Sequence, residues 1–209
     1  MTKRTTLIVS FLVVTGIGFG IVGWFFNPQT VVSPELQGIL RPESKALRDF
    51  NLVAQNQTKF NLASFKDKWT LLFFGYTFCP DICPTTLAIL KKVYTDLKPD
   101  VLANTQVVFV SVDPERDTPE QLANYIAYFD ENFVGVTGEV VEINKLVLQT
   151  GAGYIKGPAP TATDDNNYQI SHTSTIFLIN PEMKLHAGFA QPHIPEIIVE
   201  QYNLIRSLY

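Results

Sequence analysis

The sequence has few of the residues that would point to several common functions. Its 209 residues include only two cysteines, two methionines and three histidines, and the net charge is −4 with 17% charged residues. Without an excess of basic residues there is no positive field to attract nucleic acid or anionic lipid, so we exclude those partners. If the N-terminal apolar segment is set aside, about 180 residues remain, and a domain of that size is stable without a disulfide.

The one long run without charge lies near the N-terminus. Residues 7–26 read LIVSFLVVTGIGFGIVGWFF, and at about 1.5 Å per residue a helix of this length crosses a hydrocarbon core of about 30 Å. A cleaved signal peptide is the alternative, but its apolar region would be only about 7 to 15 residues long. Lys3 and Arg4 precede the run, which by the positive-inside rule keeps residues 1–6 cytoplasmic. The sequence therefore predicts a single-pass anchor at 7–26 in an inner (cytoplasmic) membrane, with the rest of the chain in the periplasm.

Hydrophobic periodicity divides the remaining chain into a linker and one domain. Residues 27–47 contain three prolines and no sustained period, which is typical of a linker. Residues 48–209 form the predicted domain, which starts with alternating segments at 49–53 and 58–62 that indicate a β-hairpin. Further elements follow, with strands predicted at 70–76, 105–112, 133–137, 170–179 and 185–189, and helices at 84–97, from 118, at 139–149 and at 195–208. Strands alternating with helices predict an α/β fold with a central sheet covered on both faces.

Cys79 and Cys83 lie in the block CPDICP, between a predicted strand and a predicted helix. The carboxyl end of a strand is where open α/β sheets bind ligands. Two thiolates four residues apart form a soft chelate for Cu(I), Zn²⁺ or a related ion, and a redox pair is the alternative. A helix N-terminus stabilises a thiolate. That role falls to Cys83 if the helix begins at Pro84 and to Cys79 if it begins at Pro80, and the sequence leaves both open.

A site held by two thiolates needs a third ligand, and three histidines are available. His172 lies near the start of the predicted strand 170–179, which would place it at the edge of the same sheet, and neutral imidazole is a good copper ligand. From the pattern alone, a packed or solvated ring is the more common outcome for an isolated strand histidine. His186 and His193 have polar neighbours in or after a predicted hairpin, and we expect them to be packed or solvated only.

Three blocks of the sequence together resemble the signatures of the Sco/SenC proteins. They are FGYTFCPDICP at 74–84, SVDPERDTP at 111–119, and SHTS at 171–174 followed by FLINP at 177–181. The resemblance implies a thioredoxin-like fold in which Cys79, Cys83 and His172 bind Cu(I) or Cu(II). It also implies a role in building the binuclear copper centre of cytochrome c oxidase. The sequence departs from the family pattern at Ser171, where many members have an aspartate.

The resemblance predicts a metallochaperone that delivers copper to the oxidase centre or prepares the cysteines of that centre. Its partners would be the copper-receiving subunit of cytochrome c oxidase, with a periplasmic copper carrier or a thiol reductase as further candidates. One alternative is a thiol-disulfide oxidoreductase acting on an oxidase subunit, with Cys79 and Cys83 as a redox-active disulfide. Another is a copper or redox sensor. Three residues separate the cysteines where a thioredoxin-type reductase has two, which disfavours the oxidoreductase.

Four charged residues are candidates for contacting a partner protein. Asp81 lies between the two cysteines, and Asp113, Arg116 and Asp117 follow the predicted strand 105–112. We expect the latter three on a loop at the sheet edge that faces the partner.

Overall fold

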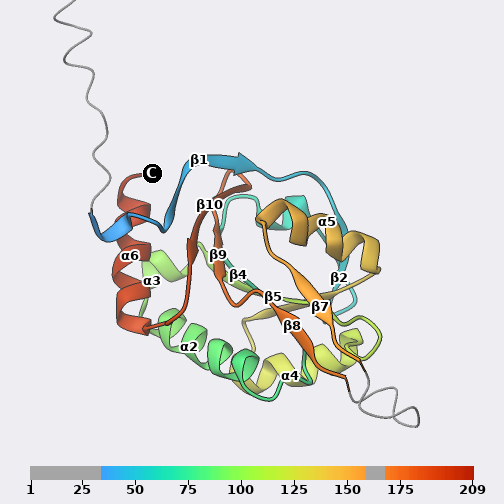
Figure 1. Cartoon of the computed structure of the whole chain (residues 1–209). Coiled ribbons are helices and arrows are strands. Elements are labelled where there is room, and N and C mark those ends of the chain that lie inside the picture. The colour runs from blue at the N-terminus through green and yellow to red at the C-terminus, as the bar shows by residue number, and fades with distance from the viewer. Residues whose placement is uncertain (1–33, 159–167) are drawn as a thin grey trace, which may run out of the picture. The chain divides into compact units, whose positions relative to one another are not determined.

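A mixed sheet forms the centre of the protein (Figure 1). In chain order the strands are β1 (Leu40–Ala46), β2 (Asn51–Ala54), β3 (Lys59–Asn61), β4 (Trp69–Gly75), β5 (Thr105–Ser111), β6 (Val134–Thr137), β7 (Tyr154–Lys156), β8 (Ile170–His172), β9 (Ile176–Ile179) and β10 (Lys184–Phe189). In the computed structural model, which describes residues 34–158 and 168–209, eight of these strands form the sheet in the order β1-β10-β9-β4-β5-β6-β2-β3. The remaining two, β7 and β8, pair with each other.

The helices cover both faces of this sheet. They are α2 (Ile82–Asp96), α3 (Pro99–Leu102), α4 (Pro119–Phe129), α5 (Val140–Thr150) and α6 (Pro195–Ser207), with short 3-10 turns η1 (Pro34–Leu36) and η2 (Leu62–Phe65). Figure 1 shows α2, α4 and α6 along one side and α5 on the other. Two of the predicted helices have well-formed ends, since Thr118 caps α4 by accepting the backbone N–H of Gln121 and α5 ends at Gly151 with φ of 76°.

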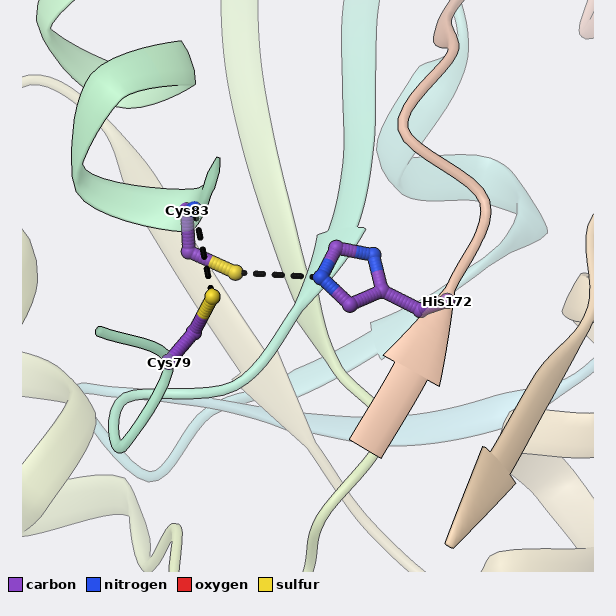
Figure 2. A group of neighbouring side chains, drawn as sticks. All are labelled: Cys79, Cys83 and His172. Carbon is purple, nitrogen blue, oxygen red and sulfur yellow. Dashed lines mark hydrogen bonds between the residues drawn. The ribbon is translucent and has the colours of Figure 1, made fainter. Parts of the chain in front are cut away.

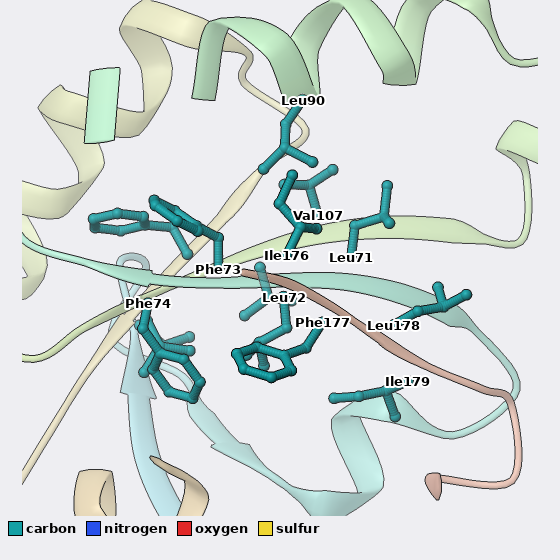
Figure 3. Packing of buried hydrophobic residues seen from close by; sticks show 14 of the residues in the cluster. Leu71, Leu72, Phe73, Phe74, Leu90, Val107, Ile176, Phe177, Leu178 and Ile179 are labelled. Carbon is teal, nitrogen blue, oxygen red and sulfur yellow. The ribbon is translucent and has the colours of Figure 1, made fainter. Parts of the chain in front are cut away.

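The two apolar runs of the sequence form the buried centre of the sheet. Strands β4 and β5 pair in parallel, and every residue of both strands is buried. Because side chains alternate along a strand, Leu71 and Phe73 point toward Leu90 of α2, while Leu72 and Phe74 point to the opposite face (Figure 3). A strand buried on both faces is continuously apolar, which is why these segments were predictable from the sequence.

The predicted β-hairpin is also present. Strands β2 and β3 pair antiparallel with Leu52 opposite Phe60, and β2 extends the central sheet by pairing with β6. The buried rings of Phe50, Phe60 and Phe65 pack together beneath the hairpin, with centroids 5.4–6.2 Å apart. The hairpin therefore contributes its own aromatic cluster to the core.

The predicted strand 170–179 is two strands, and they belong to different sheets. Strand β9 joins the central sheet beside β4, while β8 pairs with β7. Between them the backbone N–H of Thr173 donates to the carbonyl of Gly153 at 2.9 Å, and the Thr173 hydroxyl accepts from the N–H of Gly153 at 3.0 Å. Threonine side chains compete for backbone groups in this way, so Thr173 interrupts the predicted strand. His172 therefore lies on a separate hairpin and not at the edge of the central sheet.

The end of the predicted linker 27–47 is a strand. Residues 40–46 form β1, which pairs antiparallel with β10 at the edge of the sheet. Its residues are mostly exposed, and Pro42 is tolerated because an edge strand has one side free of hydrogen bonds. Backbone pairing without a buried face leaves no hydrophobic period, so the sequence pattern did not reveal this strand.

The predicted location needs correction. We expected a single-pass protein of the inner membrane with a periplasmic domain, but across residues 34–158 and 168–209 no helix has the length and apolar character needed to cross a membrane. The predicted span at 7–26 lies outside the described residues. This finding contradicts the inner-membrane location, which we withdraw.

Candidate metal centre

Cys79, Cys83 and His172 come together beyond the carboxyl end of β4 (Figure 2). Cys79 lies in the loop that leaves β4, Cys83 in the first turn of α2, and His172 at the end of β8. One ligand atom from each residue lies within 4.8 Å of the others. Within the described ranges this is the one group of three or more histidine, cysteine or acidic side chains close enough to hold a metal ion.

The start of α2 determines how the cysteines differ. The helix begins at Ile82, between the two positions that the sequence left open, and Asp81 at its N-cap makes no side-chain capping bond. The Cys79 sulfur takes that place by accepting the backbone N–H of Cys83 at 3.4 Å. Cys79 is half-buried and Cys83 is fully buried, and the two are not joined by a disulfide in the structure. The unpaired N–H groups of a helix N-terminus stabilise negative charge, so Cys79 is the cysteine that they favour as a thiolate.

The two sulfurs have opposite shifts of pKa. The hydrogen bond from the Cys83 side chain lowers the pKa of Cys79 to about 3, and bonds from the backbone of Asp81 and Cys83 act in the same direction. The same side-chain bond, together with burial, raises the pKa of Cys83. The metal-free pair is therefore one thiolate and one thiol. A soft cation that displaces the remaining proton would leave two thiolate ligands.

His172 is oriented with one ring nitrogen toward the sulfurs. Its Nε2 lies 3.3 Å from the Cys83 sulfur, and its Nδ1 lies 3.1 Å from the backbone carbonyl of Thr173. Because a carbonyl oxygen only accepts, Nδ1 carries the proton and Nε2 offers its lone pair to the site. A histidine that ligates a metal is usually oriented in this way. The rings of Phe73 and Tyr76 contact the imidazole edge to face, with centroids 5.8 and 6.0 Å away.

The site opens into a cavity of about 410 Å³. The cavity is lined by Tyr76, Cys79, Pro80, Asp81, Ile82, Gln169, Ile170, Ser171, His172, Ser174 and Gln191. Two sulfurs and one imidazole nitrogen suit Cu(I), Cu(II) or Zn²⁺, and three protein ligands leave room for a fourth from outside. The half-buried Cys79 is the sulfur that an incoming ligand reaches from the cavity.

Three of the residues expected to face a partner are held inside the protein. Asp113 is 3% exposed and Asp117 is 0% exposed, and the Arg116 side chain is 6% exposed. The loop after β5 folds back, so that Asp117 accepts from the N–H and the hydroxyl of Thr77 at 2.9 and 2.6 Å and from the Ser111 hydroxyl at 2.6 Å. The prediction that these three residues contact a partner is therefore corrected. Asp81 is exposed at the cavity, and its partner contact stays a prediction.

The other two histidines lie in packed surroundings away from the cysteines. His186 Nδ1 is 2.6 Å from the Ser44 hydroxyl, and its ring packs against Trp69. His193 Nε2 is 3.1 Å from the carbonyl of Phe189. Neither belongs to the group that could hold a metal.

Sequence reasoning missed Tyr76 as a residue of the site. Its hydroxyl donates to Oε1 of Gln169 at 2.9 Å and accepts the backbone N–H of Ile170 at 3.2 Å. Tyr76 therefore joins the end of β4 to the strand that carries His172. The only signal in the sequence was its place in the block FGYTFCP, three residues before Cys79.

Comparison with known proteins identifies the family. The SCO1/SenC sequence pattern matches residues 40–205. The chain belongs to the SCO1/SenC family. Among solved relatives, Bradyrhizobium japonicum ScoI with copper bound is 32% identical with a TM-score of 0.68, and the match covers 78% of this chain and 99% of that one. Arabidopsis thaliana ScoI with copper bound is 29% identical with a TM-score of 0.70, and the match covers 78% and 98% of the two chains.

A curated member of the SCO1/SenC family is the mitochondrial protein SCO1 homolog 1 of Arabidopsis thaliana. It is 33% identical over 144 residues, which cover 69% of this chain and 42% of that relative's length. The likeness to solved Sco structures confirms the predicted α/β, thioredoxin-like fold.

Proposed function

We propose that this protein is a copper-binding metallochaperone that delivers copper to the binuclear copper centre of cytochrome c oxidase or prepares the cysteines of that centre. The observation that carries the proposal is the Cys79, Cys83 and His172 group, whose ligand atoms lie within 4.8 Å of one another at an open cavity. Two solved Sco relatives hold copper. A third Sco protein, 23% identical, is described as a member of the Sco family of cytochrome c oxidase assembly proteins.

Copper is the cargo in this proposal. The two sulfurs would bind the ion as thiolates, and the proton that Cys83 holds in the metal-free pair would leave on binding. Nε2 of His172 would be the third ligand. A copper-receiving subunit of cytochrome c oxidase would approach through the cavity and offer its own ligand on the Cys79 side, so that copper passes by exchange of ligands. Asp81 lines that approach, and the half-exposed Phe78 directly precedes Cys79 in the chain.

A thiol-disulfide oxidoreductase is a second candidate, because the lowered pKa of Cys79 favours a nucleophilic thiolate. In this reaction the Cys79 thiolate attacks a partner disulfide and one partner sulfur leaves as a thiolate. The Cys83 thiol then loses its proton and attacks Cys79, which forms the Cys79–Cys83 disulfide and releases the second partner thiolate. Two electrons pass to the partner.

The ligand set is tested by competition titration of Cu(I) and Cu(II) against single variants. Cys79→Ser and Cys83→Ser should lose tight binding of both ions. His172→Ala should weaken Cu(II) far more than Cu(I), because two thiolates hold Cu(I) while Cu(II) favours an added imidazole. The visible absorption of thiolate-to-Cu(II) charge transfer should weaken with it.

His186→Ala and His193→Ala are the matched controls, since both rings are partly buried but lie outside the group. They should bind both copper ions like the parent protein. If His172→Ala binds Cu(II) like the parent protein, the third ligand lies elsewhere and the oxidoreductase becomes the better proposal.

A further inference from the structure

The ligand His172 lies on an element that the central sheet does not hold. Within residues 34–158 and 168–209, β8 pairs with β7 and with no other strand. The cysteines follow β4, which lies inside the central sheet. The distance between His172 and the sulfurs therefore depends on how β8 and the residues on either side of it are joined to the body of the protein.

A buried cluster makes this junction just before β8. Nε of Arg116 donates to Oδ2 of Asp113 at 2.5 Å, and Nη1 of Arg116 donates to the backbone carbonyl of Tyr168 at 3.1 Å. The Tyr168 hydroxyl donates to Oδ1 of Asp113 at 2.6 Å. The guanidinium carbon of Arg116 also lies 3.7 Å from the centroid of the Tyr168 ring. We call these three residues the Arg116–Asp113–Tyr168 clamp.

The same loop contacts the segment that carries Cys79. The guanidinium carbon of Arg116 lies 4.7 Å from the ring centroid of Phe78, the residue before Cys79. One residue after Arg116, the carboxylate of Asp117 holds Thr77 through its N–H and its hydroxyl. The loop at 113–117 is therefore in contact with both segments that bring ligands to the site.

We propose that the Arg116–Asp113–Tyr168 clamp positions His172 against the two cysteines. The clamp thereby sets the gain in Cu(II) affinity that the His172 ligand adds to the two thiolates. This inference rests on the proposed function. The planar guanidinium bonds to the Asp113 carboxylate and the Tyr168 carbonyl while it stacks on the Tyr168 ring, and a lysine ammonium cannot make all three contacts. In the part of the chain that the structure describes, the contacts of Arg116, Asp113 and Tyr168 given above are not to Cys79, Cys83 or His172, so these three are positioning residues.

The test uses Arg116→Lys in the full chain, because this variant keeps a positive charge beside the buried Asp113 carboxylate and avoids leaving that charge unpaired. Loss of the groups that orient a metal ligand costs about 10- to 100-fold in metal affinity. We expect a loss of that size for Cu(II), with Cu(I) affinity close to the parent value and a weaker thiolate-to-Cu(II) absorption. Tyr168→Phe, which keeps the ring and removes the hydroxyl, should show a smaller loss in the same direction and serves if Arg116→Lys does not fold.

Lys156→Met is the matched control. Nζ of Lys156 also lies over the Tyr168 ring, 3.9 Å from its centroid, but it pairs with the exposed Glu115. It should therefore leave the affinities for both copper ions unchanged. If Lys156→Met lowers Cu(II) affinity as much as Arg116→Lys, the loss does not depend on the bonds that Arg116 makes to Asp113 and Tyr168, and the clamp is rejected.

A metal-free measurement separates this inference from the proposed function. The backbone N–H of Ile170 donates to the Tyr76 hydroxyl, so its hydrogen exchange reports how firmly β8 is held beside β4. Exchange at Ile170 should be faster in Arg116→Lys than in the parent protein, while amides within β4 and β5 should exchange at parent rates. Unchanged exchange at Ile170, or an equal loss of Cu(I) and Cu(II) affinity, would overturn the clamp. If the parent protein binds no copper, the proposed function fails, and exchange at Ile170 still decides the clamp.

Discussion

Gly75, the last residue of β4, leaves the space that the Cys83 sulfur occupies. A Cβ atom built at Gly75 would lie 2.6 Å from Sγ of Cys83 and 2.7 Å from Cε2 of Phe109. Ordinary contacts between such atoms are about 3.5 to 4.0 Å, so the neighbours would have to retreat by about 1 Å. Both are fully buried and have no open space to enter. Gly75→Ala should therefore destabilise the protein by about 1 to 3 kcal/mol, the usual cost of overpacking a core.

This destabilisation should appear in the melting temperature and in copper binding together. For a protein of this length, about 1 kcal/mol corresponds to about 2 to 4 °C, so calorimetry should show a decrease of about 2 to 12 °C. Copper affinity should fall as well, because the displaced sulfur no longer keeps its 3.3 Å separation from Nε2 of His172.

Gly153→Ala is the matched control for Gly75→Ala. A Cβ atom at Gly153 has no neighbour within 4 Å among the described residues. An alanine there should be neutral or should stabilise the protein by about 0.4 to 1 kcal/mol through the unfolded chain. If Gly75→Ala has the melting temperature and the copper affinity of the parent protein, the end of β4 is less tightly packed against Cys83 than the distances imply.

Two further predictions follow from the buried carboxylate and from the thiols. Asp117→Ala removes the acceptor for Thr77 and Ser111 and should lower the free energy of unfolding by about 1 to 3 kcal/mol in urea titrations, and an unchanged midpoint would contradict this. Because the pKa of Cys79 is lowered to about 3, its thiolate is present throughout pH 5 to 7. Iodoacetamide should then give a single adduct at Cys79 by mass spectrometry at nearly the same rate at pH 5 and pH 7. An ordinary thiol, with a pKa of about 8.5, would slow about tenfold per pH unit.

The sequence by itself determined the features that depend on neighbouring residues. The continuous apolar runs predicted β4 and β5, because strands buried on both faces need such runs, and alternation predicted the β2–β3 hairpin. The spacing of Cys79 and Cys83 made a soft metal site or a redox pair the leading interpretations. His172 entered as a ligand only through the family resemblance, since its own strand pattern was typical of a packed ring.

The tertiary structure decided where segments distant in the sequence meet. His172 reaches Cys83 across 89 residues, on a hairpin that leaves the central sheet because Thr173 bonds to the backbone of Gly153. Asp113 and Asp117 of the charged loop after β5 are buried because their carboxylates find partners at Tyr168 and Thr77, about 55 and 40 residues away. Strand β1 exists because the exposed edge of β10 offers it backbone hydrogen bonds. Such contacts depend on which backbone and side-chain groups the folded chain brings within bonding distance. Local hydrophobic patterns do not predict them.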